Sequence, residues 1–161
     1  MISRHASLGR ATIPPPGEGK RGEEGYLGYL LRQASAAYRL QLERSLADLN
    51  VTHPQFVLLT MLSAYPGASN AELARVTLLT PQSVNVIVNN LERAGAVARK
   101  PRALHGRIIE LELTGKGRHL LTASRKHVLA IEQDVAKGLS PKEQRLVRQW
   151  LARIASDGGI A

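Results

Sequence analysis

The chain has 161 residues, of which 43% are hydrophobic, so it can build a packed core and is not a wholly disordered protein. It contains no cysteine, which excludes thiol nucleophiles, disulfides and cysteine-ligated metal centres, and it has no apolar run of the roughly 18 residues that span a membrane. The formal net charge of +9 favours an acidic partner, with nucleic acid ahead of an anionic membrane surface, although a basic protein without such a partner stays open.

The N-terminal segment, residues 1–24, combines three prolines with glycines and mixed charges and shows no apolar period. This composition predicts a flexible arm. Because the segment also lacks the apolar stretch of a secretory signal, we expect a cytoplasmic protein. Over residues 26–49, leucines and alanines recur at intervals of three and four residues, which predicts a long amphipathic helix.

Two helix-start signals follow. Thr52 with Gln55, and Ser69 with Glu72, each match the capping box, in which side chain and backbone at a helix start exchange hydrogen bonds. The first box predicts a helix of several turns that ends at a Pro-Gly pair. The second predicts a short helix that ends near Thr77.

A further helix is predicted directly after the short one. Thr80 precedes a proline, which is favoured at the first helical position, and Gly95 is expected to end the helix. Its apolar residues form one stripe, made of Val84, Ile87, Val88 and Leu91. The two helices are joined by about three residues, which is the arrangement of a helix-turn-helix.

A β-hairpin is predicted next. Residues 97–102 and 107–113 have strand patterns, the second with apolar residues at alternate positions, and a loop over 103–106 joins them. Two further helices follow, one from 115 to about 137 and one that opens with a capping box at Ser140. This order predicts a mainly α fold, a winged helix-turn-helix flanked by N- and C-terminal helices.

The predicted hairpin is strongly basic. Between Glu92 and Glu110 no carboxylate interrupts the positive charges. A solvated turn is one interpretation. The other is a wing that contacts DNA phosphates or the minor groove beside a helix in the major groove, and we favour it. The predicted wing contacts are Arg99, Lys100, Arg102, His105 and Arg107.

The stretch LTPQSVNVIVNNLERAGAVARKPRALHGRIIELELTGKG resembles the MarR (multiple antibiotic resistance regulator) family of winged-helix transcription factors. Members typically show a recognition helix, then LE..G.V.R, a wing, and a strand that ends LT..G. The matching residues are Leu91, Glu92, Gly95, Val97, Arg99, Arg107, Leu113, Thr114 and Gly117. The similarity covers about residues 26–155, which implies a MarR-like domain over 25–155 and a C-terminal tail over 156–161. Within the domain it implies a winged helix-turn-helix at about 52–114 and dimerisation helices at about 26–49 and 115–155.

The resemblance implies a ligand-responsive transcriptional repressor that binds a palindromic operator. The predicted contacts from the recognition helix are Thr80, Gln82, Ser83, Asn85, Val86, Asn89 and Asn90. The family often has Arg at the position of Val86, an acid at that of Asn89 and Asp at that of His105. Base recognition would therefore rest on polar side chains and on contact between Val86 and a thymine methyl group. The alternative is a winged helix for RNA or protein contacts without ligand sensing.

The resemblance also implies a homodimer and an effector. The N- and C-terminal helices carry more apolar surface than one small domain can cover, and pairing across a two-fold axis would bury it. They could instead pack on their own winged helix. A small anionic aromatic compound, a CoA-linked compound or no effector at all stay open. Candidate pocket residues are Arg32, Tyr38, Arg39 and His53, with a core or solvated role as the alternative.

Catalytic and metal-binding patterns are missing from the sequence. There is no Ser-His-Asp grouping, no phosphate-binding glycine loop and no HExxH. His119 and His127 are eight residues apart, about 12 Å along a helix, which is too far to share a metal without other ligands. We therefore expect no enzyme, no cofactor and no metal site, and keep a metal-sensing regulator as a lesser alternative.

Overall fold

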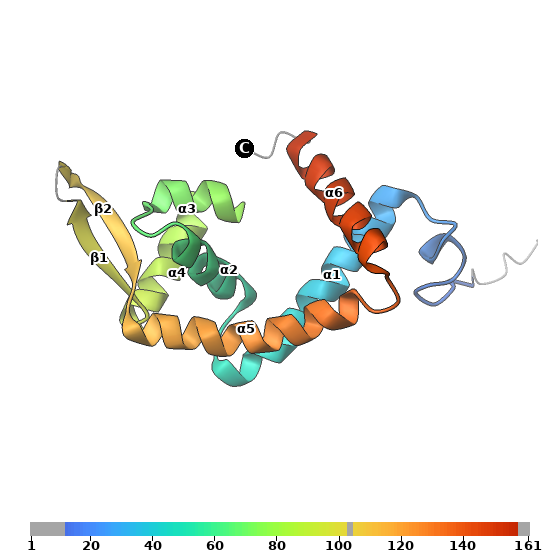
Figure 1. Ribbon diagram of the computed structural model, residues 1–161, viewed down its shortest axis with the longest axis horizontal. Helices are drawn as coiled ribbons and strands as arrows, with labels where there is room; N and C mark the ends of the chain where they lie inside the picture. Colours follow the sequence, from blue (N-terminus) through green and yellow to red (C-terminus); the bar gives the residue numbers. More distant parts are fainter. Residues whose placement is uncertain (1–11, 103–104, 158–161) are drawn as a thin grey trace, which may run out of the picture. The chain divides into compact units, whose positions relative to one another are not determined.

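The computed structural model describes residues 12–102 and 105–157, and for 102 and 105–108 it describes the backbone alone. The chain divides into two units, Met1–Arg39 and Leu40–Ala161. Helix α1, Leu27–Leu46, begins in the first unit and ends in the second (Figure 1).

The first unit contains a closed turn ahead of α1. The short 3-10 helix η1, Gly19–Arg21, lies in the segment predicted as a flexible arm. Arg21 Nη1 donates to the carbonyl of Pro14 at 2.9 Å, and the N–H of Gly17 donates to the carbonyl of Arg21 at 3.1 Å. Gly22 is buried, and a Cβ there would lie 2.2 Å from the carbonyl oxygen of Gly17, so the turn needs glycine at this position.

The second unit follows the predicted order of elements. After α1 come η2 (Ala47–Leu49), α2 (His53–Ala64), α3 (Asn70–Thr77), α4 (Pro81–Arg93), β1 (Val97–Arg102), β2 (His105–Leu113), α5 (Gly115–Val135) and α6 (Pro141–Asp157). The helix predicted over 26–49 is α-helical only as far as Leu46. Its last turn is the 3-10 helix η2, after which Asn50 takes a left-handed conformation with φ 51°.

The predicted helix starts are confirmed. Thr52 and Ser69 each form a complete capping box, and the Thr80 side chain accepts a hydrogen bond from the N–H of Ser83. At the start of α6, the N–H of Ser140 donates to Glu143 Oε2 at 2.7 Å, and the N–H of Glu143 donates to Ser140 Oγ at 3.4 Å. Capping satisfies N–H groups that a helix start leaves without partners, so these side chains fix where each helix begins.

The hairpin is longer than predicted. β1 and β2 are antiparallel, with Val97 opposite Leu113, and a register shift near Pro101 places Arg102 opposite His105. The expectation that 103–106 is a loop is wrong for 105 and 106, because this last pairing extends β2 to His105. Residues 103 and 104 lie outside the described residues. Ala68 in the α2–α3 loop also bonds to β2, accepting from the N–H of Leu111 at 3.2 Å.

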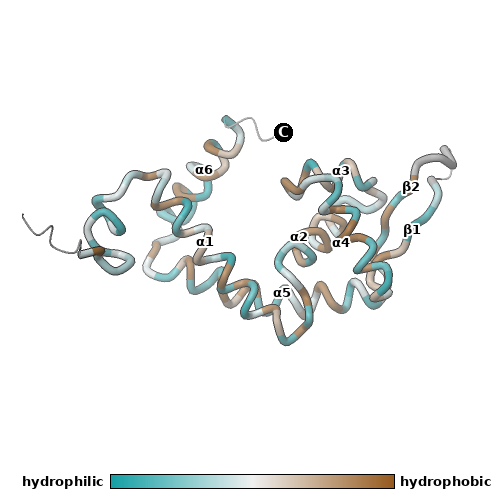
Figure 2. The backbone as a smooth tube through the Cα atoms, turned by 180° about the vertical axis from the view of Figure 1, so that it is seen from behind, coloured by the Kyte–Doolittle hydropathy of each residue, from teal (hydrophilic) through white to brown (hydrophobic). Residues whose placement is uncertain are grey.

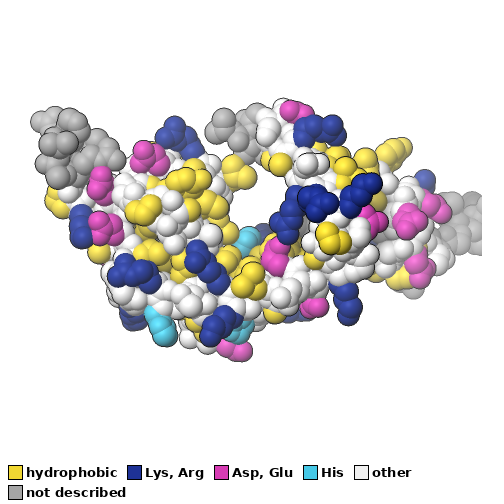
Figure 3. Space-filling model, viewed as in Figure 1, with side chains coloured by type: hydrophobic (Ala, Val, Ile, Leu, Met, Phe, Trp, Pro, Cys, Tyr) yellow, Lys and Arg dark blue, Asp and Glu magenta, His cyan; other side chains and the backbone are white. Residues whose placement is uncertain are grey.

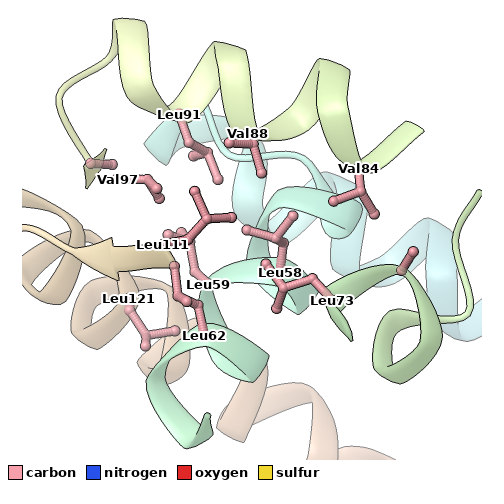
Figure 4. Packing of buried hydrophobic residues seen from close by; sticks show 12 residues of the cluster. Leu58, Leu59, Leu62, Leu73, Val84, Val88, Leu91, Val97, Leu111 and Leu121 are labelled. Carbon is pink, nitrogen blue, oxygen red and sulfur yellow. The ribbon is translucent and has the colours of Figure 1, made fainter. Parts of the chain in front are cut away.

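A single apolar cluster holds α2, α3, α4, the hairpin and the start of α5 together. Figure 4 shows the buried side chains of Leu58, Leu73, Val84, Val88 and Leu111 converging from four elements. In Figure 2, hydrophobic segments gather where α2, α3 and α4 meet and alternate with hydrophilic ones along α5. The mainly helical winged-helix fold predicted from the sequence is confirmed.

The last helix differs from the others in the second unit. No residue of α6 is buried, and Leu146, Val147, Leu151 and Ile154 are exposed by 64%, 40%, 39% and 38%. None of the helices in the described part of the chain has the length and the apolar run that crossing a membrane requires.

Candidate nucleic-acid interface

Helix α4 has two opposite stripes of side chains. Val84, Val88 and Leu91 point into the core and are at most 2% exposed (Figure 4). The opposite stripe is exposed to solvent and consists of Gln82, Asn85, Val86 and Asn89, spaced as i, i+3, i+4 and i+7. Val86 is 60% exposed although it is apolar. The core therefore orients α4 so that three amide side chains and one valine face outward.

The start of α4 is tied to α3 and to its own first turn. Thr80 Oγ1 and Ser83 Oγ lie 2.9 Å apart, so the predicted contact residues Thr80 and Ser83 also serve as the helix cap. Asn70 at the start of α3 donates from Nδ2 to Asn85 Oδ1. These bonds hold the outward stripe in a fixed position on the helix-turn-helix.

The two described cations of the wing are both paired with acids. Arg99 Nε donates to Glu92 Oε2 of α4 at 2.9 Å, and Lys100 Nζ lies 2.5 Å from Glu112 Oε2 on β2. Arg99 Nη2 also donates to Asn89 Oδ1. The basic stretch contains no acid in the sequence, but the fold brings carboxylates from outside it next to both residues.

The structure gives less detail on the other predicted DNA-contact residues. Asn90 is half-buried, and its Oδ1 accepts from Arg93 Nη2. The side chains of Arg102, His105 and Arg107 lie outside the described part of the chain, so their contact with DNA stays a prediction.

Sequence reasoning missed two residues that position the interface. Glu92 and Asn70 reach Arg99 and Asn85 from neighbouring elements. A signal for Glu92 was available, because it is the acid of the LE motif that carries the family resemblance. No pattern in the sequence marks Asn70, since its partner is 15 residues away.

Positive charge is not confined to the hairpin. Figure 3 shows Lys, Arg and His side chains along α5, which carries Lys116, Arg118, His119, Arg125, Lys126 and His127. Ser45 Oγ lies 3.3 Å from His127 Nδ1.

Among residues 12–102 and 105–157, no three His, Asp or Glu side chains gather in a way that could hold a metal ion.

The predicted effector residues are spread over both units. Arg32, Tyr38 and Arg39 belong to α1 in the first unit, and His53 is the first residue of α2 in the second. The Arg32 guanidinium carbon lies 5.8 Å from the centre of the Tyr29 ring, a cation–π contact. Tyr38 and His53 are half-buried, and Arg32 and Arg39 are exposed. A pocket shared by these four residues stays a prediction.

Comparison with known proteins identifies the family. The model of the MarR family matches residues 49–108. The HTH-type transcriptional repressor Rv2887 of Mycobacterium tuberculosis is 40% identical over 131 residues, which cover 81% of this chain and 94% of the relative. The chain belongs to the MarR family. As a MarR protein it is a DNA-binding transcriptional regulator, as the sequence predicts.

Solved structures of the same relative are similar to this MarR chain. The complex of Rv2887 with salicylic acid has a TM-score of 0.66 at 39% identity and covers 82% of this chain and 98% of that one. The complex of Rv2887 with DNA has a TM-score of 0.66 at 38% identity, with 81% and 98% covered. Both support the assignment of the winged-helix fold.

Proposed function

We propose that this MarR protein is a ligand-responsive repressor that binds a palindromic operator as a homodimer. The outward stripe of α4 carries the proposal. A capped helix that presents Gln82, Asn85, Val86 and Asn89 away from its core is suited to the major groove, where amides read base edges and valine contacts the thymine methyl group. Because operator DNA is in the cytoplasm of a bacterium, the predicted cytoplasmic location is part of the proposal.

The wing would supply phosphate contacts beside this helix. Lys100 is 59% exposed at its side chain, and its single described partner, Glu112, is 40% exposed, so a phosphate can compete for the ammonium group. We expect Arg102, His105 and Arg107, farther along the same hairpin, to act with it. The similarity to Rv2887, which has a structure in complex with DNA, supports this arrangement.

The exposed apolar face of α6 supports the homodimer. Val135 at the end of α5 and Leu139 in the α5–α6 loop, with Val147 and Leu151 on α6, line a groove of about 130 Å³. A surface of this kind usually marks an interface, and a second copy related by a two-fold axis would bury it. Two recognition helices would then meet half-sites about one helical turn apart on the DNA.

The proposal of effector binding is supported by the relative and by the chemistry of the predicted pocket residues. Rv2887 has structures with salicylic acid and with p-aminosalicylic acid, both aromatic carboxylates. Arg32, Arg39, Tyr38 and His53 offer cations and aromatic rings that suit such a molecule. We propose that an aromatic carboxylate of this class weakens operator binding.

Fluorescence anisotropy with a duplex from upstream of the gene tests the proposal. We expect tight binding that weakens steeply as salt rises, because cationic contacts release counterions from DNA. Arg107→Ala should weaken it, and salicylate should release the duplex whereas uncharged benzyl alcohol should not. Equal affinity for duplex RNA, or no dependence on salt, would favour the alternative of a module for other contacts.

A further inference from the structure

A chain of three polar side chains joins the wing to the outward stripe of α4. Arg99 on β1 donates from Nε to Glu92 Oε2 at 2.9 Å and from Nη2 to Asn89 Oδ1. Asn89 and Glu92 are three residues apart on α4, so they lie on the same side of the helix, one turn apart. The guanidinium therefore spans both side chains and fixes them relative to the strand.

The chemistry of this contact decides which way the Asn89 amide points. An asparagine amide has an acceptor oxygen and a donor nitrogen of nearly equal size, and either can turn toward a partner. A guanidinium has only donors, so the atom facing Arg99 must be Oδ1. The donor nitrogen, Nδ2, is then directed away from Arg99. The carboxylate of Glu92 keeps the guanidinium in place by a charge-assisted bond.

The other asparagines of α4 do not share this combination. Asn90 also accepts from a guanidinium, that of Arg93, but Asn90 is half-buried. Asn85 is exposed, but its partner Asn70 is itself an amide, so this pair does not fix which atom Asn85 presents. Among the described asparagines of α4, Asn89 is the exposed one whose amide direction is set by a partner with donors alone.

We propose that Glu92 and Arg99 are positioning residues that lock Asn89 as a hydrogen-bond donor toward the major groove. Asn89 would then select a base with an acceptor at that edge, O6 or N7 of guanine or O4 of thymine, ahead of adenine, whose N7 acceptor lies beside the N6 donor, and reject cytosine, which offers a donor. A freely turning amide would instead pair with adenine through both of its atoms. The inference rests on the proposed docking of α4 in the major groove.

This role differs from the phosphate contact that the sequence predicts for Arg99. A phosphate contact adds affinity on every DNA sequence and steepens the salt dependence, whereas a positioning residue changes which base is preferred. Exposed ion pairs contribute little to folding stability, so orientation of Asn89 is the consequence of the Glu92–Arg99 pair that binding experiments can detect.

The experiment compares Arg99→Met with Lys100→Met. Both variants remove an exposed, ion-paired cation from neighbouring positions of β1, but Lys100 pairs with Glu112 and not with α4. Duplexes selected from a random pool give the base preference of each variant. Fluorescence anisotropy gives the slope of the logarithm of affinity against the logarithm of salt concentration. For Arg99→Met we expect preference for guanine or thymine to fall roughly tenfold at one base pair of each half-site, with an unchanged slope. For Lys100→Met we expect uniform weakening and a slope lower by about one.

Two further variants make the result decisive. Glu92→Gln should reproduce the change in base preference without removing any cation, and it tests the proposal even if Arg99→Met folds poorly. In an Asn89→Ala background, Arg99→Met should cause no additional change in preference. Uniform weakening and a shallower slope for Arg99→Met would overturn the proposal, as would a cytosine or adenine preference at the base pair that depends on Asn89. If the wild type selects no duplex, the proposed function itself fails.

Discussion

The helix-turn-helix and the C-terminal helix α6 differ in whether their apolar side chains are buried. Leu58, Leu59, Leu73 and Val84 are fully buried within the second unit, with 0% exposure. Helix α6, with a similar stripe of apolar residues, has none buried. The first region therefore has a complete core in one copy of the chain, whereas the second has an apolar face that remains to be covered. Folding of the helix-turn-helix therefore depends on its own core, whereas the proposed assembly would use the separate apolar face of α6.

The largest expected effect comes from opening the core. Leu59→Ala should lower the free energy of unfolding by about 2–5 kcal/mol, because it leaves a cavity among packed side chains. Leu151→Ala on α6, where the residue is 39% exposed, should lower the free energy of unfolding by well under half as much, measured at a protein concentration low enough to disfavour association. Urea unfolding followed by circular dichroism measures both. Equal losses would mean that α6 is as well packed as the core.

A charge on the face of α6 should separate assembly from folding. Leu151→Lys should shift the protein from dimer to monomer and weaken operator binding about a hundredfold, because two half-sites no longer bind together. Gln149→Glu, also exposed on α6, is the matched control and should remain dimeric. Sedimentation velocity reads the state of assembly. A Leu151→Lys protein that stays dimeric would place the interface elsewhere.

Two glycines of α5 test the close approach of that helix to the turn that leads into the hairpin. A Cβ at Gly117 would lie 1.9 Å from the carbonyl oxygen of Ala96, so Gly117→Ala must push α5 away from the turn between α4 and β1 and should destabilise the protein by about 1–3 kcal/mol. At Gly115 the corresponding space is open, and Gly115→Ala should be neutral or slightly stabilising. Thermal unfolding of both variants measures the difference. A tolerated Gly117→Ala would contradict the close approach.

The smallest expected effect is on the pH dependence of α6. Hydrogen bonds from the Ser140 side chain and backbone lower the pKa of Glu143 below its ordinary value. The capping box therefore contributes above the pKa of the unfolded chain and is lost as the pH falls through the lower pKa of the folded chain. An NMR titration should show a lowered pKa for Glu143, which Ser140→Ala should return toward its ordinary value. An unchanged pKa in Ser140→Ala would assign the shift to another group.

The sequence predicts local structure here far better than contacts across the fold. Helix starts at Thr52, Ser69, Thr80 and Ser140 could be predicted, because capping depends on residues three positions apart. The start of β2 was misplaced by two residues, since the register shift at the hairpin depends on pairing between strands and not on alternation within one.

The interface shows the same limit. The outward stripe of α4 follows from helical period, so Gln82, Asn85 and Val86 could be selected from the sequence. The contact of Arg99 with Asn89 could not, because these residues are ten positions apart and meet only when β1 packs beside α4. A basic stretch without acids in the sequence therefore does not imply that its cations are unpaired in the fold.

If the outward stripe of α4 reads bases, removing one of its side chains must change which base is preferred at one position of the DNA. The base preferences of wild type, Asn85→Ala and Val86→Ala are determined by selection from a random duplex pool, with total affinity measured on unrelated DNA. We expect both variants to lose preference at particular base pairs, by about 1–3 kcal/mol each, and to keep their affinity for unrelated DNA. Equal weakening on every sequence, with preferences unchanged, would contradict it.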